Sequence, residues 1–192
     1  MHLENELCSI EITIDPTYTV SSSGNRQYDL EWNPENLHGD HDHNTAFAIH
    51  ISFACRVLDI ALVGALNSYD TNCAVLDGNV LTIMQDNTIS QVSVKDGALL
   101  LHKEFECWGC TFGLYHVSKG YVVYGEEEIL MLDEDFHKLW GFTSRDIFVS
   151  CTRGEAFEVD ERSIRVYNWF DDYYELDFSG KVIREILQET DL

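Results

Sequence analysis

Apolar and polar residues alternate along most of the chain. The stretch from Phe47 to Val57 keeps this alternation, and Tyr28 to Trp32 repeats it over a shorter span. Residues two apart share one face of a strand, whereas a helical period would spread them around the axis. The pattern therefore predicts half-buried strands, with a central strand in the more continuously apolar residues 59–66. One face of the first predicted strand carries four apolar side chains: Cys8, Ile10, Ile12 and Ile14.

Short runs rich in β-branched and aromatic residues follow one another from residue 73 to residue 187, and they favour strands. "DIFVSC", residues 146–151, is one of these predicted strands. Residues 52–61 and the C-terminal "VIREILQETDL" are the only helix candidates, so the prediction is an all-β fold of antiparallel meander sheets. Pairs of turn-forming residues separate the runs: Asp77-Gly78, Asp86-Asn87, Asp96-Gly97, Lys119-Gly120, Asp171-Asp172 and Ser179-Gly180.

Three stretches share one form, in which an alternating strand, an Asp-bearing turn and an apolar strand follow in order. They are "QVSVKDGALLLHKEF", "ILMLDEDFHKLWGF" and "YYELDFSGKVIREI". Aligning Gly97, His137 and Gly180 gives spacings of 40 and 43 residues. A four-stranded propeller blade repeats every 40 to 45 residues or so. The spacing predicts about three propeller-like repeats.

The "LD…GK" form followed by apolar residues, with Trp140 in the second copy, resembles the blade repeat of quinoprotein-type β-propellers over residues 78–187. Closed propellers take roughly four to eight blades, so three copies imply a partial or open stack and not a full ring. We expect one domain spanning residues 1–192. In it, residues 1–66 form N-terminal strands and loops, and residues 73–187 form the repeat region.

A second resemblance concerns "WGFTSRDIFVS" and the later "YNWFDDYYELDFSGKVI". These stretches are similar to small uncharacterised bacterial proteins, some of the toxin-immunity type. The resemblance implies a protein that binds and neutralises a toxin.

The formal net charge is −22, from 34 acidic and 12 basic residues. Phosphate groups would repel such a chain, which argues against nucleic acid or an anionic membrane as a partner. A basic protein partner fits the charge, although ordinary solubility explains it equally well. "MHLENELCSI" has no basic region and no apolar run of a secretory signal, so we expect a cytoplasmic protein with mainly reduced cysteines.

"LHGDHDHNTAFAIH", residues 37–50, concentrates side chains that bind metals. His41 and His43 would share one strand face, which suits metal capture, but no distant HxxxH or HExxH motif supplies a third ligand. A polar loop is the favoured interpretation of His38 to His43. A metal-dependent hydrolase using this His/Asp cluster is the alternative.

"CWGC", from Cys107 to Cys110, has the spacing of a redox or zinc motif. A redox pair usually lies at a helix N-terminus, and a structural zinc needs a second ligand pair. Both flanks here predict strands, so we expect a bulge or hairpin turn with two half-buried thiols.

Acidic clusters at predicted strand ends, next to an aromatic-rich turn, indicate an interaction surface. Aromatic rings interleaved with acids are typical of interface positions that receive Lys or Arg, although alternation also points some of these rings into the core. The predicted partner-binding residues are Glu126, Glu127, Glu128, Asp133, Asp135, Trp169, Asp171, Asp172 and Tyr173.

These patterns together favour a non-enzymatic interaction protein that needs no cofactor, has no catalytic or metal-binding residues and binds a basic protein. A bacterial immunity protein is its most concrete form. The alternatives are the hydrolase named above and a scaffold domain without a ligand. The sequence leaves the oligomeric state open.

Overall fold

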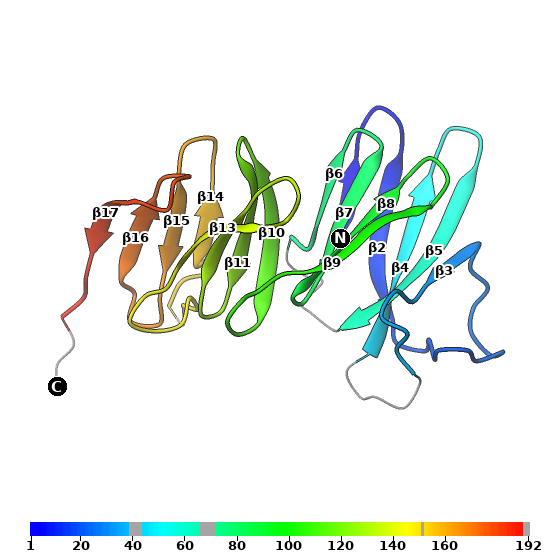
Figure 1. Ribbon diagram of the computed structural model, residues 1–192, viewed down its shortest axis with the longest axis horizontal. Coiled ribbons are helices and arrows are strands. Elements are labelled where there is room, and N and C mark those ends of the chain that lie inside the picture. The colour runs from blue at the N-terminus through cyan, green and yellow to red at the C-terminus, as the bar shows by residue number, and fades with distance from the viewer. Residues whose placement is uncertain (39–43, 66–71, 151, 190–192) are drawn as a thin grey trace. The chain divides into compact units, whose positions relative to one another are not determined.

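The computed structural model describes residues 1–38, 44–65, 72–150 and 152–189, and every regular element in these ranges is a β-strand (Figure 1). The chain divides into two compact units, Met1–Glu104 and Phe105–Leu192. The all-β prediction is confirmed. Among the described residues, no helix has the length and hydropathy that crossing a bilayer would require.

The first sheet of unit 1 has the strand order β1-β2-β4-β5-β3, with only β3 running parallel to its neighbour, β5. Its long central hairpin interrupts the alternation predicted from Phe47 to Val57, because the chain turns where Phe53 N–H donates to the Arg56 carbonyl at 2.8 Å. The helix candidate at residues 52–61 is therefore this turn followed by a strand. The bounds are β1 His2–Glu4, β2 Ser9–Asp15, β3 Leu30–Trp32, β4 Asn44–Ser52 and β5 Val57–Ala65.

The second sheet of unit 1 is an antiparallel meander in chain order. Its apolar face packs against that of the first sheet, and the shared core contains Ile49 and Ile60 from one sheet and Leu81 and Ile83 from the other. Residues two apart on a strand point to the same face, which places Ile49, Ile60, Leu81 and Ile83 on the faces that meet. The strands are β6 Ala74–Asp77, β7 Val80–Gln85, β8 Thr88–Ser93 and β9 Leu99–Glu104.

Unit 2 contains two further four-stranded meanders, here called the third sheet and the C-terminal sheet. Their core is partly aromatic: the rings of Tyr124 and Phe157 stack at 4.5 Å beside Phe148 and Tyr174. The third sheet consists of β10 Thr111–Val117, β11 Gly120–Gly125, β12 Ile129–Leu132 and β13 Lys138–Phe142. The C-terminal sheet consists of β14 Phe157–Val159, β15 Ile164–Tyr167, β16 Tyr173–Leu176 and β17 Val182–Ile186.

The three sequence repeats are the hairpins that join the third and fourth strands of the three meander sheets. Each hairpin has a register shift at the same place, between Gln91 and Val92, Met131 and Leu132, and Glu175 and Leu176. The repeat prediction is confirmed, and each of the four sheets is open, with two edge strands.

The alignment inside the second repeat was wrong by one residue. Gly97 and Gly180 have positive φ angles of 73° and 83°, and the matching left-handed residue is Phe136 at 59°, not His137. Asp133 and Asp177 form equivalent turns, in which one carboxylate oxygen accepts backbone N–H groups two and four residues later.

All six predicted turns connect strands, but the described part of "DIFVSC", residues 146–150, contains no strand. Residues 146–150 form a connection between sheets, with Phe148 fully buried. Their backbone instead pairs with two turns: Phe148 N–H donates to the Glu126 carbonyl, and Trp169 N–H donates to the Ile147 carbonyl. The boundary between the two compact units falls between residues 104 and 105 of the sequence, so the first repeat belongs to unit 1. Folding as a single domain stays a prediction.

Candidate interaction surface

The turn between β15 and β16, residues 168–172, is held by a buried asparagine. Asn168 Oδ1 accepts hydrogen bonds from the backbone N–H groups of Phe170 and Asp172, both at 3.0 Å. This is an Asx-type turn, in which the side chain replaces a backbone acceptor. Asp171 then takes a positive φ of 59°, a conformation that Asp tolerates better than most residues. The turn is thus fixed by its own sequence.

Asp172 lies beneath this turn, and its side chain is fully buried. Arg145 donates to both carboxylate oxygens, from Nε at 2.6 Å and Nη2 at 2.7 Å. The Gln188 backbone N–H and Asn168 Nδ2 donate to the same carboxylate at 2.7 and 2.9 Å. Burial alone would raise the pKa of Asp172, but the hydrogen bonds from Arg145, Gln188 and Asn168 outweigh burial and lower it. A two-pronged Arg–carboxylate pair of this kind is geometrically specific.

Asp171 anchors the outer side of the turn. Its carboxylate accepts hydrogen bonds from Thr152 Oγ1 and Ser150 Oγ at 2.5 and 2.9 Å, and Arg153 Nε lies 3.6 Å away. The hydroxyl groups of Thr152 and Ser150, followed by the charge of Arg153, lower the pKa of Asp171. Both carboxylates of the turn are therefore committed to contacts within unit 2.

The two remaining residues of the turn point outward. The Trp169 side chain is 47% exposed and that of Phe170 is 40% exposed, and the Arg145 guanidinium lies 5.0 Å from the Phe170 ring centroid. Arg145 also lines an adjacent hollow of about 320 Å³ together with Trp108, which is 68% exposed. We call Trp108, Arg145, Trp169 and Phe170 the aromatic end of unit 2.

Two of the predicted acidic residues lie at the aromatic end. Glu127 is exposed and lines the same hollow as Trp108, as does Asp146. Glu126 accepts the Phe148 N–H through its backbone carbonyl, which ties the β11–β12 turn to the connection leading into this region. Negative charge and exposed rings therefore meet here.

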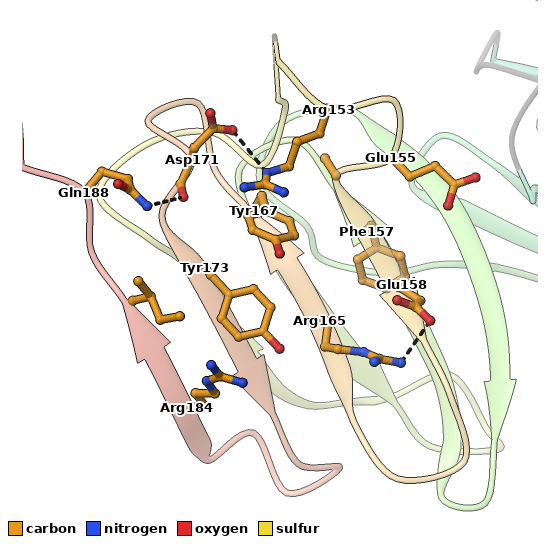
Figure 2. Close-up of a pocket in the computed structure, with 12 residues that line it drawn as sticks. Arg153, Glu155, Phe157, Glu158, Arg165, Tyr167, Asp171, Tyr173, Arg184 and Gln188 are labelled. Atoms are coloured by element: carbon orange, nitrogen blue, oxygen red, sulfur yellow. Dashed lines mark hydrogen bonds and ion pairs between the residues drawn. The ribbon is translucent and has the colours of Figure 1, made fainter.

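The other predicted residues do not gather with them. Asp133 and Asp135 lie in the β12–β13 turn, at the opposite end of β12 from Glu126 and Glu127. Tyr173 lies on the outer face of the C-terminal sheet, away from the tip of the turn (Figure 2). The predicted set is thus divided over three places.

Two predicted binding residues, Glu128 and Asp172, are buried, which corrects the expectation that both would be exposed turn charges. Glu128 Oε1 accepts a hydrogen bond from Lys138 Nζ at 2.7 Å, and Oε2 has no partner among the described residues. Gly141 leaves the space that Glu128 occupies, since a Cβ there would lie 1.8 Å from Oε1. Neither carboxylate is available to a partner, and replacing Asp172 with Lys would bury a cation against Arg145.

Trp108 and Arg145 belong to the aromatic end but were not predicted. Trp108 is a spacer residue of the CWGC motif, and its exposed side chain is what that motif contributes here. Arg145 is separated by 27 residues from Asp172, so no local sequence pattern predicts that the two side chains pair. Asn168 could have been found, because it lies three residues before the predicted turn pair, and an Asn side chain that accepts the backbone N–H two residues later is typical of an Asx turn.

The CWGC motif lies in the connection from β9 to β10, which belong to different sheets, so it is not a hairpin turn. The nearest register irregularity lies just after it, between Thr111 and Gly113. Cys107 is half-buried as expected, but Cys110 is exposed, so the expectation of two half-buried thiols was wrong for Cys110. No helix N-terminus adjoins the motif, in agreement with the sequence argument.

Within the His/Asp cluster, residues 39–43 lie outside the described residues, so the hydrolase alternative is not tested by geometry. His38 is exposed, and His50 Nδ1 lies 2.8 Å from Asp59 Oδ1 on the neighbouring strand. Over the part of the chain that the structure describes, no group of three or more His, Cys, Asp or Glu side chains is placed to hold a metal ion.

Comparisons with known proteins relate this chain to others by fold. No family model matches it, and no curated protein matches it. The computationally designed Ika8 protein has a TM-score of 0.51 at 9% identity, over 76% of this chain and 46% of that one. BamB from Moraxella catarrhalis follows with a TM-score of 0.46, 14% identity and coverage of 92% and 51%. Hsv2 from Kluyvelomyces marxianus has a TM-score of 0.43, 8% identity and coverage of 73% and 44%.

BamB and Hsv2 are β-propellers. The chain spans about half the length of the solved structures it matches. Its own strand topology defines the class: an all-β protein with three four-stranded meanders of propeller type and one five-stranded sheet.

Proposed function

We propose that the chain is a non-enzymatic, cytoplasmic interaction protein and that its aromatic end docks a basic protein partner. The observation that carries the proposal is the display of Trp169 and Phe170 on a turn fixed from below by Asn168 and the Arg145–Asp172 pair. Rigid aromatic side chains lose little conformational entropy on binding, and they are the most frequent interface anchors. A turn already in its bound shape lowers the cost of association further.

The charges around the aromatic end support a basic partner. Arg145 is paired with Asp172, and Arg153 lies beside Asp171, so these two cations are locally compensated. Glu126, Glu127 and Asp146 make no ion pair among the described residues and leave this region negative. Their field speeds the encounter with a cationic surface and is screened over about 8 Å at physiological salt.

The most concrete form of the proposal is a bacterial immunity protein that neutralises a basic toxin domain. It is supported by the resemblance of residues 140–150 and 167–183 to proteins of that type, and these stretches include both Arg145 and the turn at residues 168–172. A toxin gene immediately upstream of the coding sequence would favour this form. Protection of cells in co-expression with that toxin would test it.

The general proposal is tested by capturing partners from the native cells with four baits. They are the wild type, Trp169→Ala, the double variant Glu126→Lys with Glu127→Lys, and Leu100→Ala. Leu100 is a matched control, because its side chain is 54% exposed but lies on β9 in unit 1. Wild type and Leu100→Ala should recover the same basic protein, and the other two should lose it.

Binding kinetics with the recovered protein separate the two contributions. Trp169→Ala should raise the off-rate about tenfold or more, as expected for a buried anchor. The double Lys variant should instead slow the on-rate, and rising salt should reproduce its effect in the wild type. Equal capture by wild type and Trp169→Ala would refute the site.

A further inference from the structure

The outer face of the C-terminal sheet forms a hollow of about 420 Å³ (Figure 2). Along its strands, alternate residues such as Ile164, Val166 and Leu176 are buried in the core shared with the third sheet. The intervening residues point the other way, and three arginines are among them or beside them: Arg153, Arg165 and Arg184. In a chain with a net charge of −22, this is an unusual concentration of cations.

One row of this face carries charges of alternating sign across all four strands. Glu158 on β14 pairs in register with Arg165 on β15, Arg165 with Glu175 on β16, and Glu175 with Arg184 on β17. We call these four residues the charge ladder. Arg165 Nη2 lies 2.9 Å from Glu158 Oε1 and 2.6 Å from Asp160 Oδ2, whereas Arg184 makes no ion pair among the described residues.

The neighbouring row of the same face is aromatic and apolar. Tyr167 and Tyr173 pair in register with their ring centroids 5.1 Å apart, and Ile186, which is 43% exposed, pairs with Tyr173. Arg153 covers the Tyr167 ring at 3.9 Å, and Arg184 lies 5.6 Å from the Tyr173 centroid. The face therefore offers apolar area beside the charge ladder.

The charge ladder is complementary to itself. Its order from β14 to β17 is negative, positive, negative, positive, so the reversed order places opposite charges face to face at every position. A twofold axis parallel to the strands, between β15 and β16, produces this reversal. It sets Glu158 against Arg184 of a second copy and Arg165 against Glu175, and it also brings Tyr167 opposite Tyr173. We propose that this face binds a second copy of the chain in a symmetric dimer.

The alternation of sign selects this occupant over the other candidates. A strongly basic protein would meet the arginines of the hollow, and nucleic acid would be repelled by the net charge of the chain. A twofold axis across the strands would oppose like charges, so the ladder also fixes the orientation. Because the four charges of the ladder sum to zero, this row adds no net repulsion to the approach of a second acidic chain.

The size of the face predicts a weak dimer. Four strands about 4.8 Å apart, with residues rising about 3.3 Å each, give a patch of roughly 19 Å by 15 Å. Such a patch is smaller than a standard interface, so a dissociation constant in the micromolar range or weaker is expected. The dimer goes beyond the proposed function, because Trp169 and Phe170 belong to the β15–β16 turn and not to the charge ladder.

Sedimentation equilibrium from about 1 µM to about 1 mM tests the dimer with two charge reversals. Glu158→Arg places a cation against Arg184 of the second copy, and Arg184→Glu places an anion against Glu158 of the second copy. Each clash occurs twice in a symmetric dimer. Each variant alone should therefore dimerise at least about tenfold more weakly than the wild type. An equimolar mixture of the two should dimerise again, because both contacts then join opposite charges.

Recovery of dimerisation in the mixture shows that the charges act across the interface. If a substitution weakened dimerisation by disturbing its own chain, mixing would not restore it, because each chain still carries its substitution. Glu185→Arg and Arg162→Glu are matched controls: both side chains are exposed, and neither belongs to the ladder. Both controls should dimerise like the wild type, and circular dichroism should show the same strand content throughout. A wild type that stays monomeric, single variants that dimerise normally, or a mixture that fails to recover would each overturn the proposal.

Discussion

The two units use the same kind of contact to join their two sheets, but different residues surround it. In each unit, a tryptophan on an edge strand of one sheet donates its indole N–H to a carbonyl in the last hairpin of the other sheet. Trp32 on β3 donates to Gly97 at 2.8 Å, and Trp140 on β13 donates to Phe178 at 3.2 Å. Both hairpins place a left-handed glycine against the strand that bears the tryptophan: Gly97 approaches Leu30, and Gly180 approaches Trp140.

What surrounds these contacts differs. The core of unit 1 is largely aliphatic, built from isoleucines and leucines on facing strands. Unit 2 adds stacked rings and a buried Asp172 that pairs with the exposed Arg145, and aspartate side chains hold several of its turns. Buried polar networks fix local geometry more strictly than apolar contacts do. The comparison shows that polar contacts fix the positions of individual side chains more often in unit 2 than in unit 1. The aromatic end lies in unit 2.

The largest expected effect contrasts two aspartates, each paired with an arginine. Asp172→Ala should lower the free energy of unfolding by about 3 kcal/mol or more, because it removes four hydrogen bonds to a buried carboxylate and takes away the Asp172 acceptor of the buried Asn168 amide. Asp59→Ala in unit 1 should cost about 1 kcal/mol or less. The Asp59 side chain is 29% exposed and water can replace it for Arg26 and His50. Urea denaturation of both variants measures the difference, and equal costs would break the comparison.

Three glycines give the next effect. A Cβ at Gly97 would lie 2.4 Å from Leu30 Cδ1, and one at Gly180 would lie 2.8 Å from Trp140 Cδ2, while Gly78 has nothing within 4 Å. All three have positive φ, which alone costs a residue with a Cβ about 1 kcal/mol. We expect losses of roughly 3, 2 and 1 kcal/mol for Gly97→Ala, Gly180→Ala and Gly78→Ala. Thermal unfolding should rank them in this order, and an equal loss at all three positions would mean that the tryptophan hairpins are loosely packed.

As the pH falls, unit 2 should lose stability at a higher pH than unit 1. Hydrogen bonds to the carboxylates lower the pKa of five aspartates in unit 2 and of two in unit 1. A carboxyl whose pKa is lower in the folded state contributes stability at neutral pH, and that contribution is lost as the pH falls below about 4. The residues are Asp133, Asp160, Asp171, Asp172 and Asp177 in unit 2, and Asp15 and Asp96 in unit 1.

Hydrogen exchange with mass spectrometry resolves the two units in this experiment. After correction for intrinsic exchange, amides in residues 105–189 should lose protection at a higher pH than those in residues 1–104. Simultaneous loss would show that the units unfold together, as the prediction of a single domain requires.

The strands and turns were predictable because they depend on neighbours in sequence. Period-two alternation located β2 and β4, the continuously apolar run at residues 59–66 located β5, and turn pairs such as Asp77-Gly78 located the hairpins. The repeat was also visible, but its alignment slipped because the left-handed position that Gly97 and Gly180 occupy is taken by Phe136 in the middle copy. An alignment based on glycines fails where a residue that rarely adopts the left-handed conformation, here Phe136, takes that position.

The candidate site was only partly predictable for a different reason. Asp172 looks like a solvated turn residue, and the donors that make its burial favourable include Arg145, 27 residues away, and Gln188, 16 residues away. Glu128 is buried because Gly141 and Lys138, on the adjacent strand, provide space and charge for it. Contacts between residues far apart in sequence decide which acids face solvent, and alternation does not report them.

The central claim is that Trp169 touches a basic partner, and site-specific photocrosslinking in the native cells tests it most directly. A photoreactive phenylalanine analogue replaces Trp169 in one strain and Leu100 in a second. The account predicts one adduct at position 169, with a protein that has more Lys and Arg than Asp and Glu, and none with that protein at position 100. Adding Glu126→Lys and Glu127→Lys should remove the adduct. No adduct at position 169, or the same adduct at both positions, would contradict the account.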